Sequence, residues 1–372
     1  MSLPLQISPD SLTDFSLPLT FCDTYWFKFP PVERLFFYSL PQPKPTFLIS
    51  TLPKLRHSLS LTLRHFLPLA GNLTWPPDSP IPIVLYTPND GVPSPSPSPT
   101  QPTISTSSPA TTGFSVGVTC HHAFLDGKST TMFMKAWAHI CRSEQPVLPP
   151  ELTPFFRPLT RADIAKLREK VLSSWDKPEK LRLTSFAVTY SYIALCTLRA
   201  TEDDFEAGKK NKFLLGFTAD FRNRLKPAIP ENYFGNCVGP VINYGDLIKT
   251  LKESADKEPL TVVAAEVNEL MKKLEEDVME GAAEEFLKLM RAFKEAIGGA
   301  GVAGSPRFGV YEMDFGWGRP EKVEIVSVDR TGAMALAESR DGSGGIEIGV
   351  VFRKHQMDVF SSLFHAGLEN HV

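Results

Sequence analysis

The chain has 372 residues, of which 42% are hydrophobic and 22% charged, proportions that are typical of globular proteins. This length is too great for one ordinary core, so we expect two domains. A net charge of −3 gives no electrostatic basis for binding nucleic acid or an anionic membrane, and no apolar run approaches the length of a membrane span. Five cysteines without close pairing indicate reduced thiols, and the N-terminus lacks the features of a signal peptide. We therefore expect a protein of the cytosol.

The N-terminal half combines short strands with helices. Aromatic and apolar runs predict strands at 36–40, 81–86 and 114–119. Leucines recur at threes and fours between Leu48 and Leu63, which predicts a helix. Because Pro53 fits best in the first turn, this helix should begin near Thr51.

Residues 92–112 are rich in Pro, Ser and Thr. Such a composition cannot bury enough apolar surface to offset the entropy lost on ordering, so we expect a disordered tract. Each proline also lacks the donor that a central strand needs. The tract should therefore be the first site of cleavage in limited proteolysis.

The segment His121–Gly127 follows the predicted strand at 114–119. An amphipathic helix should come next, since Phe133, Ala136, Trp137 and Ile140 share one face. We expect Ser129 or Thr130 to cap the N-terminus of this helix.

The C-terminal half also mixes helices and strands. Helical patterns occupy 161–173, 184–199, 259–297 and 354–368. Strands are expected at 213–219 and, as an antiparallel meander, at 323–328, 333–337 and 346–352. Residues 341–345 should form a hairpin turn in that meander.

A histidine at the end of a strand, beside an acidic residue and a glycine, suits a general base for an attacking hydroxyl or amine. A core histidine next to a turn is the alternative. A zinc site built from Cys120, His121, His122 and Asp126 is disfavoured, because adjacent extended residues face opposite sides of the chain.

Several spaced motifs together resemble the plant BAHD acyltransferases, which move an acyl group from coenzyme A to an alcohol or amine. They are HxxxD with a following glycine at 122–127, DFGWG at 314–318, YFGNC at 233–237, and the stretches 21–31, 64–73 and 220–224. The YFGNC form resembles the clade that malonylates phenolic and flavonoid glycosides. The chain is shorter than members of that family, and its strand before Leu17 looks short or missing.

The resemblance implies an α/β fold with two chloramphenicol-acetyltransferase-like domains, in which helices flank mixed β-sheets and the active-site channel lies between the domains. Residues 1–150 would form the N-terminal domain with HxxxD and the tract 92–112. Residues 151–160 would be a shortened crossover, and residues 161–372 a C-terminal domain with YFGNC and DFGWG.

The resemblance also assigns roles to individual residues. His122 would be the base, whereas His121 would be structural. Asp126 would turn away from the imidazole and pair with an arginine, for which Arg222 and Arg224 are the candidates. The remaining residues fall into a structural group, Asp314, Gly316 and Gly318, and a group of channel or substrate contacts, Trp317, Tyr233, Asn236 and Arg340.

The activity implied is that of an acyl-CoA-dependent O-acyltransferase, with malonyl-CoA as co-substrate and a phenolic or flavonoid glycoside as acceptor. No bound cofactor or metal is expected, and we expect a monomer whose partners are small molecules. One alternative is a non-catalytic, shortened paralogue that binds ligand or a partner protein. A peptide-forming condensation domain would fit HHxxxDG at 121–127 but neither of the two later motifs.

Overall fold

The computed structural model describes residues 4–6, 15–41, 43–88, 90–93, 113–143, 158–159, 161–175, 181–275, 278–292, 295 and 297–369. The chain forms two compact units, which we describe separately. The N-terminal unit consists of Met1–Pro154 and Phe308–Glu324, and the C-terminal unit of Phe155–Arg307 and Ile325–Val372. The DFGWG segment therefore belongs with the HxxxD segment, whereas the sequence assigned it to the C-terminal domain.

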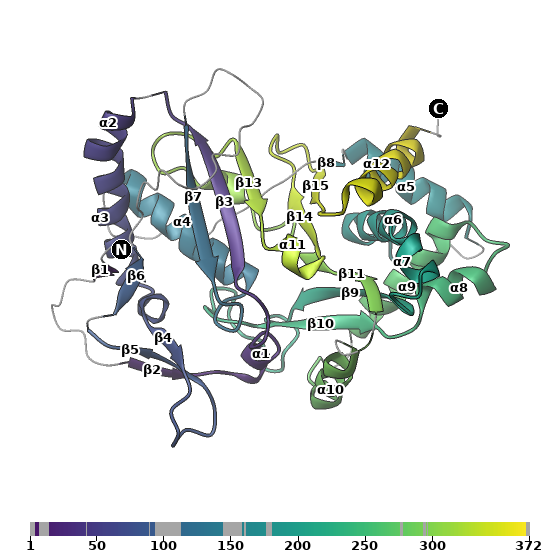
Figure 1. Ribbon diagram of the computed structural model, residues 1–372, viewed down its shortest axis with the longest axis horizontal. Helices are drawn as coiled ribbons and strands as arrows, with labels where there is room; N and C mark the ends of the chain where they lie inside the picture. Colours follow the sequence, from purple (N-terminus) through teal and green to yellow (C-terminus); the bar gives the residue numbers. More distant parts are fainter. Residues whose placement is uncertain are drawn as a thin grey trace. The chain divides into compact units, whose positions relative to one another are not determined.

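Among its described residues, the N-terminal unit contains three small sheets and two main helices (Figure 1). Its strands are β1 (Pro4–Gln6), β2 (Phe15–Pro18), β3 (Val32–Ser39), β4 (Asn72–Thr74), β5 (Ile83–Tyr86), β6 (Gly91–Pro93), β7 (Gly113–Cys120) and β13 (Lys322–Ile325). Its helices are α1 (Phe21–Thr24), α2 (Lys44–Thr46), a π-helix (Phe47–Thr51), α3 (Leu52–Leu63), α4 (Gly127–Ser143) and two 3₁₀ turns (Leu67–Ala70 and Val310–Glu312).

The central sheet of this unit has the order β13-β3-β7. Strands β3 and β7 are antiparallel and pair along their whole length, from Val32 with Cys120 to Ser39 with Gly113. Alternate residues of β3 are buried, as expected for a strand with one face on a core. This pairing fixes the end of β7, and therefore the point at which the HxxxD segment begins.

Two smaller sheets lie at the N-terminal end of the chain. Strands β2 and β5 pair antiparallel, as do β1 and β6, in which Pro4 faces Pro93 and Leu5 faces Val92. The strand before Leu17, which was expected to be short or missing, is present as the three residues of β1. Val92 and Pro93 belong to a strand, which corrects the start of the predicted disordered tract; residues 94–112 lie outside the described residues.

Helices α3 and α4 pack against each other. The indole N–H of Trp137 donates to the carbonyl oxygen of Leu55 at 3.2 Å and to the hydroxyl of Ser58 at 3.1 Å. Phe66, which follows α3, meets Phe133 edge to face at 5.5 Å. These contacts come from the apolar face predicted for the second helix, so this face holds α4 in place.

The part of the C-terminal unit that the structure describes contains two sheets and a larger set of helices. Its strands are β8 (Pro158–Leu159), β9 (Lys212–Asp220), β10 (Val238–Asn243), β11 (Ile297–Ala300), β12 (Val302–Ala303), β14 (Met334–Glu338) and β15 (Ile346–Gly349). Its helices are α5 (Arg161–Ser173), α6 (Ser185–Ala200), α7 (Glu202–Glu206), α8 (Leu247–Glu253), α9 (Pro259–Lys273), α10 (Ala282–Ala292), α11 (Val328–Thr331) and α12 (Lys354–Glu369).

The core of this unit surrounds α6. Thr184 caps the helix by accepting the N–H of Ala187, and most of its side chains are buried, so the predicted apolar helix is confirmed. The sheet β10-β9-β11 is mixed, because β9 is antiparallel to β10 and parallel to β11. Mixed sheets with helices packed on them make the unit α/β, as the sequence predicted.

Two predicted elements of this unit differ from the structure. The helical pattern 259–297 is divided into α9 and α10, and Ile297 begins β11. Gly281, at φ 67°, lies just before α10, and a left-handed residue cannot continue a right-handed helix. The strand predicted at 323–328 is β13, which joins the β3 sheet of the N-terminal unit rather than the β14–β15 hairpin.

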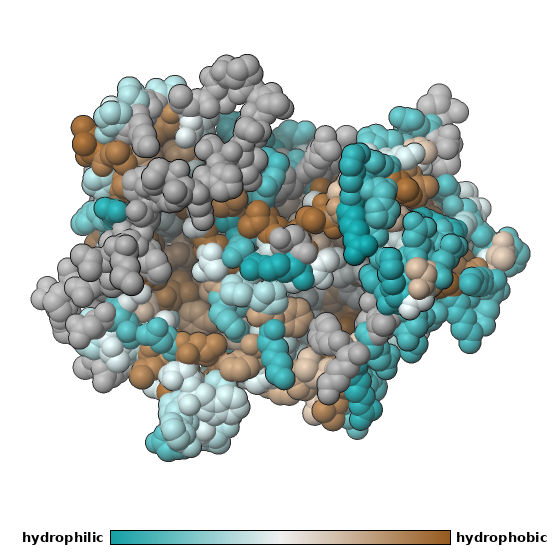
Figure 2. All heavy atoms as spheres, viewed as in Figure 1, coloured by the Kyte–Doolittle hydropathy of each residue, from teal (hydrophilic) through white to brown (hydrophobic). Residues whose placement is uncertain are grey.

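The surface of the C-terminal unit around α7 and α8 is mainly hydrophilic (Figure 2). Among the described residues, no helix is both long and apolar enough to cross a membrane.

Candidate active site

The HxxxD segment connects the end of β7 to the start of α4. Its first residues form a tight turn, in which the N–H of Phe124 donates to the carbonyl oxygen of His121 at 3.0 Å. The Nδ1 atom of His121 accepts the N–H of Ala123 at 3.1 Å. His121 therefore stabilises the turn through its own ring, which agrees with a structural role.

Asp126 is the N-cap of α4. Its carboxylate accepts the N–H of Ser129 at 2.8 Å, and its carbonyl oxygen accepts both the N–H and the hydroxyl of Thr130, at 3.0 and 2.9 Å. The helix begins at Gly127, so the predicted cap at Ser129 or Thr130 was wrong. The side chain of Asp126 is almost fully buried and is directed at the helix N-terminus, where a negative charge is stabilised.

His122 lies flat against the indole of Trp26. The ring centroids are 4.2 Å apart and the ring planes differ by 15°. Phe29 contacts the imidazole from a second side, with an edge-to-face geometry at 6.4 Å. The catalytic candidate thus sits in an aromatic environment that leaves it only partly exposed.

This environment keeps the imidazole of His122 uncharged. Burial lowers the pKa of His122 to about 4, and the charge of Arg34 and the neighbouring His121 lower it further, whereas the carboxylate of Asp126 opposes the shift. At neutral pH the ring is therefore a free base that can take a proton.

Arg34 is a buried arginine that sequence reasoning missed. Its guanidinium donates to the hydroxyl of Thr131, the fifth residue of α4, at 3.0 Å and lies 6.0 Å from the ring of Phe308. Burial lowers the pKa of Arg34 to about 10, and the nearby charge of Asp126 opposes this shift. The sequence held one signal: Arg34 occupies the same alternate positions of β3 as the buried Phe36 and Tyr38.

Arg222 and Arg224, the predicted partners of Asp126, lie in the C-terminal unit. The guanidinium of Arg222 is fully buried and donates to the carboxylate of Asp220 at 3.0 Å and to the carbonyl oxygens of Tyr233 and Gly235 at 3.2 and 3.0 Å. Arg224 donates to the carbonyl oxygen of Asp220. The pairing of either arginine with Asp126 stays a prediction.

The YFGNC segment is held by Arg222. The guanidinium lies 5.7 Å from the ring of Tyr233, and Gly235 adopts φ 144°, which favours glycine. Asn236 is buried. Arg340 lies far along the chain, exposed beside the turn in which Ser339 and Ser343 contact the carboxylate of Asp341. The assignment of Tyr233, Asn236 and Arg340 as channel or substrate contacts stays a prediction.

The DFGWG segment forms a turn around the carboxylate of Asp314. This carboxylate accepts the N–H groups of Gly316 and Gly318 at 2.7 and 2.9 Å, and both glycines have left-handed φ angles, 104° and 96°. The ring of Trp317 packs edge to face on Phe114 at 5.7 Å. Phe114 is the second residue of β7, so this contact lies about 20 Å along the strand from the end that His122 follows.

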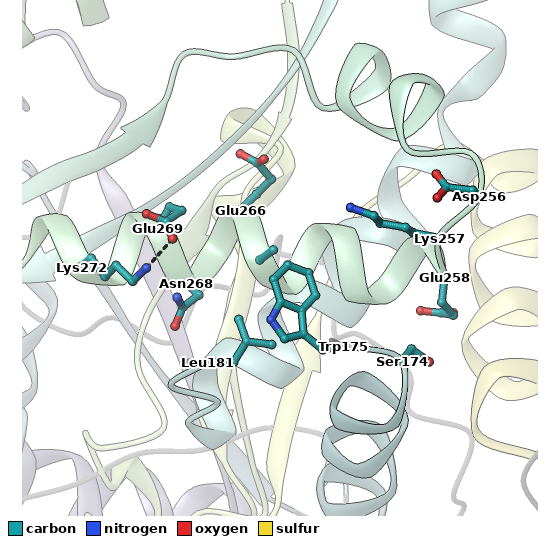
Figure 3. Close-up of a pocket in the computed structure, with 11 residues that line it drawn as sticks. Ser174, Trp175, Leu181, Asp256, Lys257, Glu258, Glu266, Asn268, Glu269 and Lys272 are labelled. Carbon is teal, nitrogen blue, oxygen red and sulfur yellow. Dashed lines mark hydrogen bonds and ion pairs between the residues drawn. The ribbon is translucent and has the colours of Figure 1, made fainter. Parts of the chain in front are cut away.

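A separate pocket of about 940 Å³ lies in the C-terminal unit (Figure 3). It is lined by the indole of Trp175 and by charged side chains of α9 and the preceding loop, among which Lys272 is bonded to Glu269. None of the residues that the motifs single out lines it. Among the described residues, no three His, Cys, Asp or Glu side chains are grouped so as to hold a metal ion.

Comparisons with known proteins agree with these motifs. The family model described as "Transferase family" matches residues 6–84, 110–157 and 151–366. The chain is 34% identical to phenolic glucoside malonyltransferase 1 of Arabidopsis thaliana, with 97% of this chain and 95% of the relative covered. It is 36% identical to malonyl-CoA:anthocyanidin 5-O-glucoside-6''-O-malonyltransferase of the same plant, with 98% and 97% covered.

The fold also has solved counterparts. The crystal structure of vinorine synthase matches with a TM-score of 0.67 at 20% identity, covering 97% of this chain and 96% of that one.

The alignment with the first relative, phenolic glucoside malonyltransferase 1, extends over 457 positions, more than the 372 residues of this chain. The relative therefore carries segments that this chain lacks, which confirms that the chain is shortened.

Proposed function

This chain belongs to the Transferase family, the BAHD acyltransferases, and from that premise we propose that His122 is the general base of a malonyl transfer to a phenolic or flavonoid glycoside. The chain is an acyltransferase with an acyl-CoA as co-substrate. The observation that carries the proposal is the position of His122, an uncharged imidazole at the junction of β7 and α4.

The reaction needs one general base, which takes a proton from the acceptor and later gives it to the leaving group. The imidazole of His122 takes the proton of the acceptor hydroxyl while the oxygen attacks the thioester carbonyl carbon and a tetrahedral intermediate forms. The carbon–sulfur bond then breaks. The departing coenzyme A thiolate takes the proton from the imidazolium, so the products are an ester and a free thiol, and the histidine is again neutral.

The lowered pKa of His122 has opposite effects on these two steps. An imidazole with a pKa of about 4 is a weaker base toward the acceptor, but it is fully deprotonated at neutral pH. Its conjugate acid is correspondingly stronger, which favours protonation of the thiolate. The aromatic environment of His122 therefore weakens the base in the first step and strengthens the acid in the second.

Asp126 and Arg34 stabilise the chain segment that carries the base. Asp126 caps the start of α4, and Arg34 donates to Thr131, the fifth residue of that helix. Neither residue is proposed to contact the acyl group. Their role in the proposal is to hold the backbone that carries His122.

The donor and acceptor classes come from the relatives. Both relatives at 34–36% identity are named for malonyl transfer, one to phenolic glucosides and one to an anthocyanidin glucoside. The YFGNC form of residues 233–237 is in keeping with the same clade. We propose malonyl-CoA as the donor on this basis.

The shortened chain favours a second candidate, a non-catalytic relative that binds ligand or a partner. The observation behind it is the set of positions that the first relative has and this chain lacks. This candidate predicts binding of coenzyme A thioesters without thiol release.

One experiment separates the two candidates. Purified protein is incubated with malonyl-CoA and a flavonoid glucoside, and free thiol and a product heavier by one malonyl group are measured together. Acetyl-CoA as donor and the sugar-free flavonoid as acceptor are the specificity controls. Thiol release that depends on the glucoside supports the enzyme. Calorimetric binding of malonyl-CoA without thiol release would support the second candidate.

A further inference from the structure

We propose that Trp26 is the positioning residue of His122: its indole fixes the plane in which the imidazole receives the proton of the acceptor. The inference rests on the proposed role of His122 as the base. Its geometric basis is the stacking of the two rings, with centroids 4.2 Å apart and planes within 15°. Trp26 itself is 7% exposed, so it is a packed residue beside His122 and not a mobile surface residue.

The chain before Trp26 is shaped to hold it. Asp23 accepts the N–H and the hydroxyl of Thr20 at 2.6 and 2.7 Å, which closes the start of α1. The N–H of Trp26 then donates to the carbonyl oxygen of Asp23 at 3.1 Å, and the N–H of Phe29 to that of Trp26 at 3.0 Å. Two successive turns therefore fix the backbone on either side of the indole.

Phe29 is a second aromatic ring that packs against both Trp26 and His122. Its ring meets Trp26 at 5.1 Å and His122 at 6.4 Å, edge to face in both cases. If the imidazole rotated about its bond to Cβ, one ring edge would move into the indole face. The flat stack therefore restricts the imidazole to one plane, which is the geometric requirement for repeated proton transfer.

The indole N–H of Trp26 gives independent support. It is buried and has no hydrogen-bond partner among the described residues. No hydrogen bond to a described residue therefore fixes the orientation of this ring, and its packing against His122 and Phe29 does so instead. A phenylalanine at this position would keep an aromatic face without the unused donor.

The charged and titratable groups around His122 are Asp126 from the loop before α4, Arg34 from β3 and the adjacent His121. Their effects partly cancel, because Asp126 opposes Arg34 and His121. Exclusion of water is the largest influence on the imidazole, and Trp26 covers one whole face of it. Removing the indole should therefore let water reach the ring and bring its titration closer to that of an ordinary histidine.

The test compares Trp26→Phe with Trp26→Leu. Trp75→Phe and Trp75→Leu are matched controls, since Trp75 is 58% exposed and its ring contacts Phe27 rather than His122. Two quantities are measured for each variant: the pH dependence of kcat/KM, and the titration of the His122 ring by NMR in protein labelled at histidine. The His122→Ala protein identifies that signal among the eight histidines.

Trp26→Leu should lower kcat/KM at neutral pH roughly 10- to 100-fold and move the titration of His122 upward by about one pH unit or more. Trp26→Phe should retain most of the activity and most of the low titration point, and both Trp75 variants should match the wild type. A folded Trp26→Leu protein in which the titration of His122 is unchanged would overturn the inference.

Failure of the inference and failure of the proposed function give different results. If His122→Ala remains active, the proposed function fails whatever the Trp26 variants do. If His122→Ala is inactive while Trp26→Leu keeps both the wild-type rate and titration, only the positioning role fails. If Trp26→Leu does not fold, Trp26→Phe decides, because a loss of the low titration point in that variant would contradict a role for the aromatic face.

Discussion

The carboxylate of Asp126 accepts the backbone N–H of Ser129 at 2.8 Å, so the aspartate of the HxxxD motif is the N-cap of α4. The helix it caps begins one residue later, and His122 stands four residues before the cap. The spacing of the motif thus has a structural cause: the residue that starts the helix and the residue proposed as base are joined by one short turn.

Replacing Asp126 should lower stability in two separable steps. Asp126→Asn keeps an acceptor for Ser129 but removes the charge near Arg34, whereas Asp126→Ala removes both. A lost cap costs about 0.5–2 kcal/mol, and a buried arginine left without its counter-charge costs roughly 3–5 kcal/mol. We expect Asp126→Asn to melt below the wild type and Asp126→Ala lower still.

Thr184→Ala is the matched control, because the hydroxyl of Thr184 caps α6 by accepting the N–H of Ala187. It should show the cap cost without the loss of a charge. Unchanged melting of Asp126→Ala with abolished activity would contradict the structural role and point to direct orientation of His122 by the carboxylate.

The acidic limb of the pH–rate profile should lie near pH 4. If His122 is the base, kcat/KM falls when its imidazole is protonated, and burial sets the pKa of that step to about 4 instead of the ordinary 6.5. The rate should therefore be nearly constant from about pH 5.5 to 8. A limb centred near 6.5 would show that water reaches the ring in the working enzyme.

Stability should also depend on pH through His122. Its pKa is lower in the folded protein than the ordinary value of 6.5, so the unfolded chain binds more protons between about pH 4 and 6.5. The contribution of the neutral His122 to the free energy of unfolding is fully present above about pH 6.5. It is lost as the pH falls toward 4, by at most about 3 kcal/mol.

Denaturant unfolding of wild type and His122→Asn at several pH values checks this contribution. The variant should lose less stability on acidification, whereas the exposed His65→Asn should behave like the wild type. Parallel loss of stability in wild type and His122→Asn would contradict a buried, neutral imidazole.

Gly316→Ala should destabilise the protein while the folded fraction keeps its turnover within a few-fold. A Cβ at Gly316 meets only ordinary contacts, the nearest at 3.6 Å, so the cost comes from φ 104° and is about 1–3 kcal/mol. Gly301→Ala is the control, because its Cβ would meet only Ala333 at 3.9 Å. Melting temperature and kcat are measured together. A large fall in kcat without a change in melting would place the turn in the chemistry.

The sequence predicted the parts of this site that depend on local pattern. His122, Asp126 and the helix after them follow from one short segment, and the apolar helix α6 follows from composition alone. The cap was assigned to Ser129 or Thr130 because both are good caps, but the choice depends on where the helix begins. Asp126 takes that place because its carboxylate reaches the Ser129 N–H.

What the sequence could not predict depends on contacts between distant residues. Arg34 reaches Thr131 across 97 positions of chain, and β13 pairs with β3 rather than with the nearby β14. Periodicity describes which residues face inward but not which strand they meet. The helical pattern after Pro259 likewise continues past Gly281, whereas α9 ends at Lys273 and the left-handed Gly281 directly precedes α10.

The measurement that tests the account most directly is the turnover of His122→Ala with malonyl-CoA and a flavonoid glucoside. His121→Asn is the control, since its amide can still accept the Ala123 N–H that the ring nitrogen accepts now. We predict that His122→Ala, with its fold retained by circular dichroism, releases coenzyme A about 10²- to 10⁴-fold more slowly than the wild type, and that His121→Asn stays within a few-fold of it. Turnover of folded His122→Ala within a few-fold of the wild type would contradict the account.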